Sequence, residues 1–198
     1  MKPFAESCEE NKLPILEILQ QELTDCREVL EIGSGTGQHA VFFSQQLPHV
    51  TTWQTSDLAE SHPGIQAWLA EADNPRILPP LELAVCRDHW PEQHYDAVFS
   101  ANTFHIMSWE SVICAMAGIG KILKSGGRFC LYGPFNYAGQ YTSDSNARFD
   151  RWLKDRDPLS GIRNVEDLDE LAQSAGLTLK ADHAMPANNR ILVWRKTY

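Results

Sequence analysis

The fold is decided by the stretch Glu28-Val29-Leu30-Glu31-Ile32-Gly33-Ser34-Gly35-Thr36-Gly37-Gln38-His39. Its apolar run, residues 29–32, is typical of a buried parallel strand, and an amphipathic stretch follows the glycines. Such a glycine turn lets the backbone pass close to a ligand, while the start of the following helix offers free N–H groups and the positive end of its dipole. We therefore expect a nucleotide-like cofactor at this turn.

The spacing of the glycines indicates which cofactor this is. A dinucleotide fingerprint, G-x-G-x-x-G, has its last glycine where this chain has Gln38. The pattern Gly-x-Gly-x-Gly, preceded by Glu31, instead resembles motif I of the class I S-adenosylmethionine (SAM)-dependent methyltransferases. That resemblance implies that Glu31 faces the methionine end of SAM, and that Gly33, Gly35 and Gly37 pass under its ribose.

A second signal is Asp57, which stands 20 residues beyond Gly37 and follows a second strand-like run, residues 50–55. A carboxylate at that distance can bind both hydroxyls of a ribose. The glycine turn alone could be a tight strand-to-helix connection without a ligand. Together, the two signals favour cofactor binding.

Composition limits the class of protein. The chain has 198 residues, 43% of them hydrophobic and 22% charged, which predicts one globular domain over residues 1–198. The net charge of -9 disfavours binding to DNA, RNA or an anionic membrane. The first residues lack the apolar region of a signal peptide, and no apolar run is long enough to span a membrane. We expect a cytoplasmic protein.

The cysteines predict reduced thiols. There are five, an odd number, and none is part of a C-x-x-C pair. This pattern suits a reducing compartment and disfavours disulfides or a zinc site. We expect no bound metal.

Strand-like runs alternate with amphipathic helical stretches along the whole chain. The expected strands are residues 29–32, 50–55, 81–85, 95–102, 128–132, 177–184 and 190–196. Helices are expected with N-caps at Asn11, Ser108 and Asn164, after the glycine turn up to Pro48, around residues 65–69, and at residues 145–155 with Phe149 and Trp152 inward. The alternation predicts an α/β fold with helices on both faces of a parallel sheet. The methyltransferase resemblance implies a seven-stranded, Rossmann-like sheet whose last strand is antiparallel.

Further segments supply candidate contacts to the cofactor. The first helix, with Asn11 and Lys12, could cover the cofactor as leading segments do in many class I methyltransferases, although Lys12 is equally well explained as a solvated charge. Asp88 and Trp90 follow the third strand, where this fold usually holds the adenine. Asp88 could accept from the adenine amino group and Trp90 could stack, or both could be ordinary loop residues. Asn102 ends the fourth strand, where open α/β sheets place their chemistry.

Three residues are candidates for catalysis. His105, just past the fourth strand, is the first candidate for a base that removes a proton from the acceptor. It could instead cap a helix or orient the substrate. Tyr132 and Asp150 are second-rank candidates, with packing as the alternative for Tyr132 and a salt bridge, for instance with Arg163, as the alternative for Asp150. The aromatic and glycine-rich start of residues 133–164 suggests that this segment is a lid over the site.

Several stretches together resemble one small family over nearly the whole chain. They are Asn11-Lys12-x-Pro14-Ile15-Leu16, the glycine stretch from Glu31 to His39, Trp53-Gln54-x-Ser56-Asp57, Ala101-Asn102-x-x-His105-Ile106, Tyr132-Gly133-Pro134-Phe135, Thr142-Ser143-x-Ser145-Asn146-x-x-Phe149-Asp150 and Arg156-Asp157-Pro158-x-x-Gly161-Ile162-Arg163. This pattern is similar to the methyltransferase-like 26 family, and the resemblance implies a SAM-binding class I fold. The chain departs from the family at Glu10, where arginine is usual, and at Ala84 and Asn164, where aspartate is usual.

The absence of three known motifs limits the classes of methyl acceptor to be expected. The fourth strand does not end in the Asx-Pro-Pro-aromatic turn of amino-methylating enzymes, there is no Pro-Cys nucleophile, and Glu110 stands without the second glutamate of protein arginine methyltransferases. A SAM-dependent methyltransferase of a small molecule is thus the leading hypothesis. The alternatives are a non-catalytic SAM-binding sensor or partner module, and a nicotinamide-dependent oxidoreductase, against which Gln38 argues. The sequence does not indicate an oligomeric state.

Overall fold

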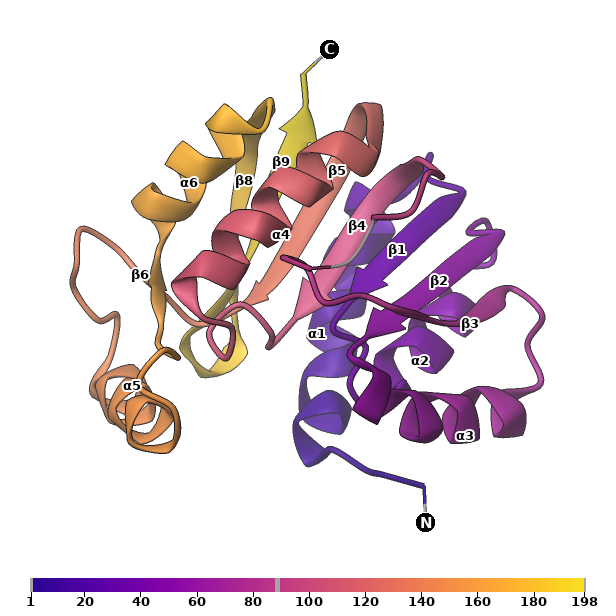
Figure 1. The fold of residues 1–198 in the computed structure, drawn as a ribbon, viewed down its shortest axis with the longest axis horizontal. Helices are drawn as coiled ribbons and strands as arrows, with labels where there is room; N and C mark the ends of the chain where they lie inside the picture. The colour runs from indigo at the N-terminus through magenta and orange to yellow at the C-terminus, as the bar shows by residue number, and fades with distance from the viewer. Residues whose placement is uncertain (1, 88–89, 198) are drawn as a thin grey trace.

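The computed structural model describes residues 2–87 and 90–197 and has a seven-stranded sheet at its centre (Figure 1). The strands lie in the order β3-β2-β1-β4-β5-β9-β8. Six run parallel, and β9 is antiparallel to both of its neighbours. The predicted α/β sheet with one antiparallel strand is therefore confirmed. The strand bounds are β1 Glu28–Ile32, β2 Thr52–Asp57, β3 Ile77–Glu82, β4 Tyr95–Ala101, β5 Leu123–Gly133, β8 Leu177–Met185 and β9 Asn189–Lys196.

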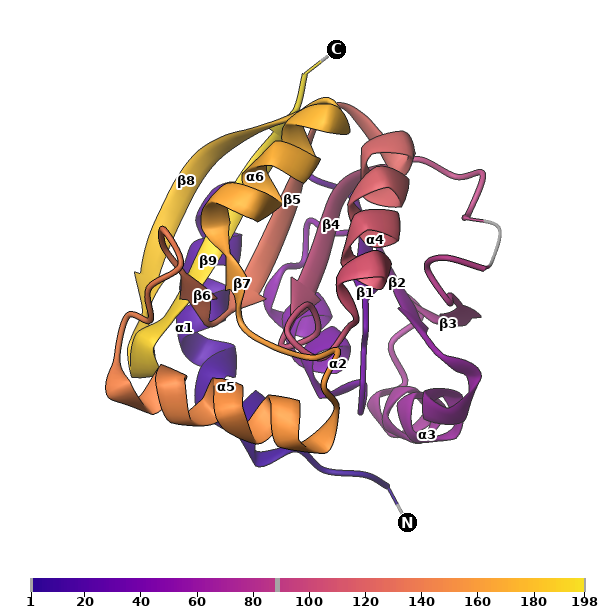
Figure 2. The same cartoon turned by 60° about the vertical axis from the view of Figure 1, so that its left-hand side comes forward.

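Helices cover both faces of the sheet. Helices α4 and α6 lie on one face, and α1, α2 and α3 lie on the other (Figures 1 and 2). Helix α5 lies apart from both layers, beyond the carboxyl ends of the parallel strands (Figure 2). The helix bounds are α1 Glu6–Glu22, α2 Gln38–Gln46, α3 His62–Ala72, α4 Trp109–Ile122, α5 Asp144–Arg156 and α6 Val165–Ser174, with short 3-10 helices at Ala59–Ser61 and Pro186–Asn188.

The central strands are buried on both faces, and this explains their continuous apolar runs. Leu30 and Val98 point into a core with α4 and α6. Their neighbours Val29 and Phe99 point into a second core with α1 and α2. All four side chains are fully buried. Because helices cover both faces of the sheet, polar groups of the central strands can reach solvent only at the ends of the strands. The candidate functional site lies at the carboxyl ends.

The third strand was expected at residues 81–85, but β3 is Ile77–Glu82. It contains Pro79 and Pro80, which argue against a strand in the middle of a sheet. However, among the described strands β3 pairs only with β2 and forms an edge, where a residue without an N–H group is tolerated. The apolar residues that suggested the strand, Leu83 to Val85, lie instead in the loop beyond it.

The first helix begins earlier than expected. Asn11 was predicted to be its N-cap, but α1 starts at Glu6 after Ala5, and Pro14 lies inside the helix. Asn11 is 8% exposed, and its Oδ1 lies 2.7 Å from Nε2 of His39 in α2. The side chain therefore joins two helices, which the sequence pattern did not show.

The segment proposed as a lid, residues 133–164, has structure of its own. The short strands β6 (Phe135–Asn136) and β7 (Arg163–Asn164) pair in parallel and bracket α5. Trp152 was expected to face inward, but its exposed fraction is 50%, and it stacks on Phe149 at a centroid distance of 5.7 Å. The polar side of α5, rather than this tryptophan, is turned toward the domain, as the buried Asn146 and Asp150 show.

The expectation of reduced cysteines is wrong for one pair. Cys86, in the loop after β3, and Cys114, on α4, form a disulfide across 28 residues of sequence. Their sequence spacing carries no sign of this, because the fold brings the loop against the helix. Cys8, Cys26 and Cys130 are free thiols.

The described residues contain neither a membrane-spanning helix nor a metal-binding cluster. No helix within 2–87 and 90–197 is both long enough and apolar enough to cross a membrane. In the same part of the chain, no three His, Cys, Asp or Glu side chains gather where they could hold a metal ion.

Candidate functional site

The glycine loop lies at the carboxyl end of β1. Gly33 has a φ of +72°, and a Cβ atom there would lie 2.5 Å from Oγ1 of Thr103, so the loop packs directly on the residues after β4. Gly35 has a φ of +58°, and a Cβ atom there would meet nothing within 4 Å, so this part of the backbone faces open space. The loop thus combines a tight contact with β4 and an exposed stretch of backbone that a ligand can approach.

Asp57, the last residue of β2, ties the glycine loop to the neighbouring strand. Its Oδ2 accepts a hydrogen bond of 2.7 Å from the backbone N–H of Gly35, and its Oδ1 accepts one of 2.7 Å from Leu58. The N–H groups of Gly33 and Ser34 both donate to the carbonyl of Ser56, each at 3.0 Å. These contacts set the carboxylate beside the exposed glycine backbone.

Glu31 lies directly under the loop. Its carboxylate is fully buried and accepts hydrogen bonds from Nε1 of Trp53 (3.1 Å) and Oγ of Ser34 (3.0 Å). Burial raises the pKa of Glu31 to about 7, although the two hydrogen bonds act in the opposite direction. The residue can therefore be neutral or charged near neutral pH. A cation nearby would favour the charged form.

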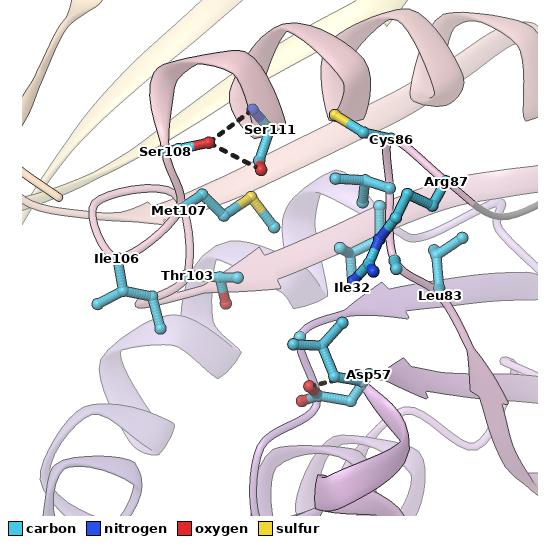
Figure 3. A pocket seen from close by; sticks show the side chains of 14 residues that line it. Ile32, Asp57, Leu83, Cys86, Arg87, Thr103, Ile106, Met107, Ser108 and Ser111 are labelled. Atoms are coloured by element: carbon cyan, nitrogen blue, oxygen red, sulfur yellow. Dashed lines mark hydrogen bonds between the residues drawn. The ribbon is translucent and has the colours of Figure 1, made fainter. Parts of the chain in front are cut away.

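Three adjoining cavities open along the carboxyl ends of the strands. The loop cavity, of about 370 Å³, lies between the loop after β3 and the start of α4; Figure 3 shows Asp57 and Ser111 at opposite ends of it. Its walls include Ile32, Leu83, Val85, Cys86, Arg87, Met107 and Ser108.

The glycine cavity, of about 440 Å³, lies over the loop from Gly33 to Thr36 and includes Cys8, His39 and Asp57. It shares five lining residues with the loop cavity, namely Gly33, Asp57, Leu58, Thr103 and Ile106. The two cavities therefore form one continuous depression, and the Asp57 carboxylate lies where they meet.

The helix cavity, of about 570 Å³, lies between α1, α5 and the β8–β9 turn. Its lining residues are Ser7, Glu10, Asn11, Pro14, Asn102, Tyr132, Pro134, Ser145, Asn146, Phe149, Pro186, Ala187 and Asn189. Ser7 and Asn102 also line the glycine cavity, so the two cavities meet at these residues.

Asn102 holds a strained position at that junction. Its φ is +56°, in the left-handed region that asparagine tolerates better than most residues, and its N–H donates to the carbonyl of Tyr132 at 3.0 Å. It was expected to contact the cofactor, and it lines two of the cavities.

Two of the other expected cofactor contacts, Lys12 and Trp90, do not line the cavities. Lys12 forms an ion pair with Glu9 and lies 5.0 Å from the ring centroid of Phe42, away from the cavity linings. Trp90 donates from Nε1 to the carbonyl of Val85 at 3.1 Å and packs on Gly118 of α4, so it does not line the loop cavity. Asp88 lies outside the described residues.

Of the three catalytic candidates, Tyr132 alone lines one of these cavities. Burial raises its pKa, against the effect of hydrogen bonds with Asn11 and Asn189, so its hydroxyl stays protonated. His105 is 7% exposed, and burial followed by the charge of Arg163 lowers its pKa to about 4. Its ring is neutral at neutral pH and lies behind the cavity wall, against Phe149.

Asp150 has a structural set of partners. Its carboxylate accepts hydrogen bonds from the hydroxyl of Tyr141 (2.6 Å), Nζ of Lys154 (2.6 Å) and the N–H of Ile162 (2.7 Å). Lys154 is thus its ion-pair partner, instead of the expected Arg163, whose guanidinium donates to backbone carbonyls of Phe104 and Met107. Asp150 fixes α5 to the segment that follows it.

Several lining residues were not expected from the sequence. Thr103 follows Asn102 directly and Met107 lies five residues beyond Asn102, so their position after β4 could have identified them. Glu10, Asn146 and Asn189 come from three segments far apart in the chain, and nothing in their local sequence indicates that they meet.

Comparisons with known proteins agree with the fold. The model of a family described as a protein of unknown function, DUF938, matches residues 2–196. Similar solved structures include an O-methyltransferase family protein from Burkholderia thailandensis (TM-score 0.82, 14% identity) and the S-adenosylmethionine-dependent methyltransferase SibL (0.81, 20%). A third is CalO1, a methyltransferase in calicheamicin biosynthesis, in its SAH-bound form (0.76, 18%).

Those alignments cover 94%, 97% and 96% of this chain but only 56%, 56% and 54% of the other three. The chain thus spans just over half the length of these structures. At such identities the similarity shows a class I methyltransferase fold. The narrower resemblance to the methyltransferase-like 26 family is not confirmed by these matches.

Proposed function

The chain belongs to the DUF938 family of proteins of unknown function, and we propose that it is a SAM-dependent methyltransferase acting on a small molecule. The observation that carries this proposal is the continuous run of three cavities at the carboxyl ends of the strands, with Asp57 at one junction and Asn102 at the other. Such a run offers room for a nucleoside, for an extended polar chain and, beyond it, for a second molecule.

The residues present fit SAM. The apolar walls of the loop cavity, with Ile32, Leu83 and Val85, suit an adenine ring, and Asp57 can accept from both ribose hydroxyls. The open space beside the Gly35 backbone leaves room for the ribose and the methionine part. When bound, SAM would supply an electrophilic methyl group to an acceptor atom attacking in line, with S-adenosylhomocysteine as the leaving group.

The negative groups nearby suit this cationic ligand. Glu31 lies under the loop with a pKa near neutrality, and it positions Ser34 through its hydrogen bond. A positive charge in the glycine cavity would stabilise the Glu31 carboxylate. We therefore retain Glu31, Gly33, Gly35, Asp57 and Asn102 as proposed cofactor residues. Asn11 lines only the helix cavity, Gly37 packs on Ile65, and Lys12 and Trp90 lie outside the three cavity linings, so the proposal does not depend on these four or on Asp88.

The chain's own residues can align an acceptor and exclude water, which is most of what methyl transfer requires. Tyr132 presents a protonated hydroxyl to the helix cavity and can donate to the acceptor. His105 has the neutral imidazole that a base needs, and movement of Phe149 would be required to expose it. Asp150 acts as a positioning residue, because it holds α5 over the cavity.

A small-molecule acceptor and a cytoplasmic setting are parts of the same proposal. The net charge of -9 supports an acceptor other than nucleic acid. The description of the similar CalO1 as a methyltransferase in calicheamicin biosynthesis also favours a small acceptor. The cytoplasmic setting is supported by the sequence, and a Cys86–Cys114 disulfide that stays oxidised inside cells would contradict it.

The test is formation of S-adenosylhomocysteine from SAM in the presence of a cell extract that has been separated by ultrafiltration. We expect turnover with the low-molecular-weight fraction, and much less turnover by the Asp57→Ala variant at a SAM concentration below saturation. Turnover with only the macromolecular fraction would refute a small acceptor. SAM binding without turnover in any fraction would favour the non-catalytic sensor or partner module.

A further inference from the structure

Among the described residues, the helix cavity is lined by a single charged side chain, which is negative. Of the 13 described residues that line it, Glu10 is the only one with a charged side chain. Glu10 is exposed, and it has no ion pair among the described residues. The nearby cations Lys12 and Arg190 are paired with Glu9 and Asp182, respectively. The cavity therefore offers one carboxylate to whatever enters it.

The backbone of α1 adds to the same character. Pro14 lies inside the helix and has no N–H group, so the carbonyl of Glu10 lacks its usual i+4 donor. Both residues line the cavity. Carbonyl and carboxylate oxygens on one turn of helix make this wall rich in acceptors, which suits a ligand that carries N–H donors.

The remaining walls are aromatic, apolar or neutral and polar. Phe149 and Tyr132 present rings, and the amides of Asn102, Asn146 and Asn189 can bind neutral groups. Aromatic faces attract cations, and the net charge of the chain attracts them at longer range. No described lining residue offers the arginine or lysine that recognition of a carboxylate or phosphate normally uses.

We propose that the helix cavity binds a small organic cation, an amine-bearing molecule, and that Glu10 selects it by charge. This inference rests on the proposed function, because the cavity meets the glycine cavity at Ser7 and Asn102 and so would hold the methyl acceptor. Glu10 is a specificity-determining residue in this account.

The test uses three probes of nearly the same shape on protein loaded with S-adenosylhomocysteine: tyramine, which is cationic; tyrosol, which is neutral; and 3-(4-hydroxyphenyl)propanoate, which is anionic. Calorimetric titration should show tyramine binding about five-fold more tightly than tyrosol, the size expected of a partly exposed ion pair. The propanoate should bind more weakly than tyrosol.

The variants Glu10→Gln and Glu10→Lys distinguish the effect of the Glu10 carboxylate from the effect of the net charge of the whole chain. We expect Glu10→Gln to bind tyramine and tyrosol with about equal affinity, with tyrosol binding unchanged from the wild type. We expect Glu10→Lys to bind the propanoate more tightly than tyrosol. Glu17→Gln, on the same helix but outside the cavity lining, removes the same charge and should leave the preference unchanged. Because Glu10 is exposed, these variants should fold.

Equal binding of tyramine and tyrosol would overturn the inference, and so would a failure of tyramine to bind. A preference unaffected by Glu10→Gln would also overturn the role of Glu10. Binding of S-adenosylhomocysteine before the titration tests the proposed function separately. A failure to bind it would contradict the proposal that the protein binds SAM, but not the proposal that the helix cavity binds a cation.

Discussion

Replacing Glu31 by glutamine should stabilise the protein at alkaline pH. The carboxyl of Glu31 is fully buried, and its two hydrogen-bond partners, Trp53 and Ser34, do not offset the cost of burying its charge. Glutamine has a similar shape and can accept the hydrogen bond from Trp53 without ever becoming charged. The substitution should therefore remove an electrostatic cost and little else.

The magnitude follows from the pKa. Burial raises the pKa of Glu31 from 4.5 to about 7 in the folded protein. A carboxyl with a higher pKa when folded favours folding below its unfolded pKa, and this contribution is lost as the pH rises toward the folded pKa. At 1.36 kcal/mol per pKa unit, the total loss is about 3 kcal/mol, and most of it falls between about pH 5 and about pH 8.

The assay is urea unfolding of the wild type and Glu31→Gln at both pH values, without ligand. The free energy of unfolding of the variant, relative to the wild type, should increase by about 2 to 3 kcal/mol from the lower pH to the higher. Using this pH-dependent difference cancels any constant effect of the substitution on packing.

Asp96→Asn is a control at a carboxyl whose pKa shift has the opposite sign. Although burial acts to raise it, the pKa of Asp96 is lowered by hydrogen bonds from Lys124 and from the N–H groups of Arg27 and Glu28. The contribution of this carboxylate is lost only as the pH falls below its unfolded pKa of 3.8, so the cost of Asp96→Asn should be the same at about pH 5 and at about pH 8. The reasoning about Glu31 is refuted if Glu31→Gln shows no pH-dependent gain, or a loss, while the Asp96 control behaves as stated.

Two further predictions concern the covalent and ionic links around the site. Reduction of the Cys86–Cys114 disulfide by dithiothreitol should lower the free energy of unfolding by about 3 to 4 kcal/mol, because the bridge closes a loop across 28 residues of sequence. Cys114→Ser should be insensitive to dithiothreitol in urea unfolding, and an equal effect of the reductant on both proteins would contradict the bridge. Asp150→Asn should cost about 1.5 to 3 kcal/mol at neutral pH, since the hydrogen bonds to a buried carboxylate are weakened. Lys154 and the other partners lower the pKa of Asp150 despite its burial, so this cost should shrink in acid; a cost independent of pH would argue against the ionised form.

The sequence predicted the layers and the glycine loop because both depend on local patterns. The apolar run before Gly33 and the distance from there to Asp57 are short-range signals, and the structure places the Gly35 backbone and the Asp57 carboxylate in contact. The third strand was placed too late because the apolar residues after Pro80 resemble a strand. Whether Pro79 is tolerated within a strand depends on that strand being at an edge, which is a property of the whole sheet.

The acceptor side of the site could not be predicted in the same way. The helix cavity gathers Glu10 from α1, Asn146 from α5 and Asn189 from β9, segments that only the complete fold brings together. His105 was chosen for its place after β4, but the direction of its side chain depends on packing against Phe149. The disulfide likewise joins a loop to a helix that no spacing rule connects.

The central claim, that this site binds SAM, is tested most directly by calorimetric titration of the purified protein with SAM and S-adenosylhomocysteine, with NAD as the control ligand. The account predicts micromolar binding of both adenosyl ligands, no binding of NAD, and a loss of up to about 3 kcal/mol of SAM binding energy in Asp57→Ala, since a charged hydrogen-bond partner is removed. Binding of NAD without SAM, or SAM affinity unchanged in Asp57→Ala, would contradict it.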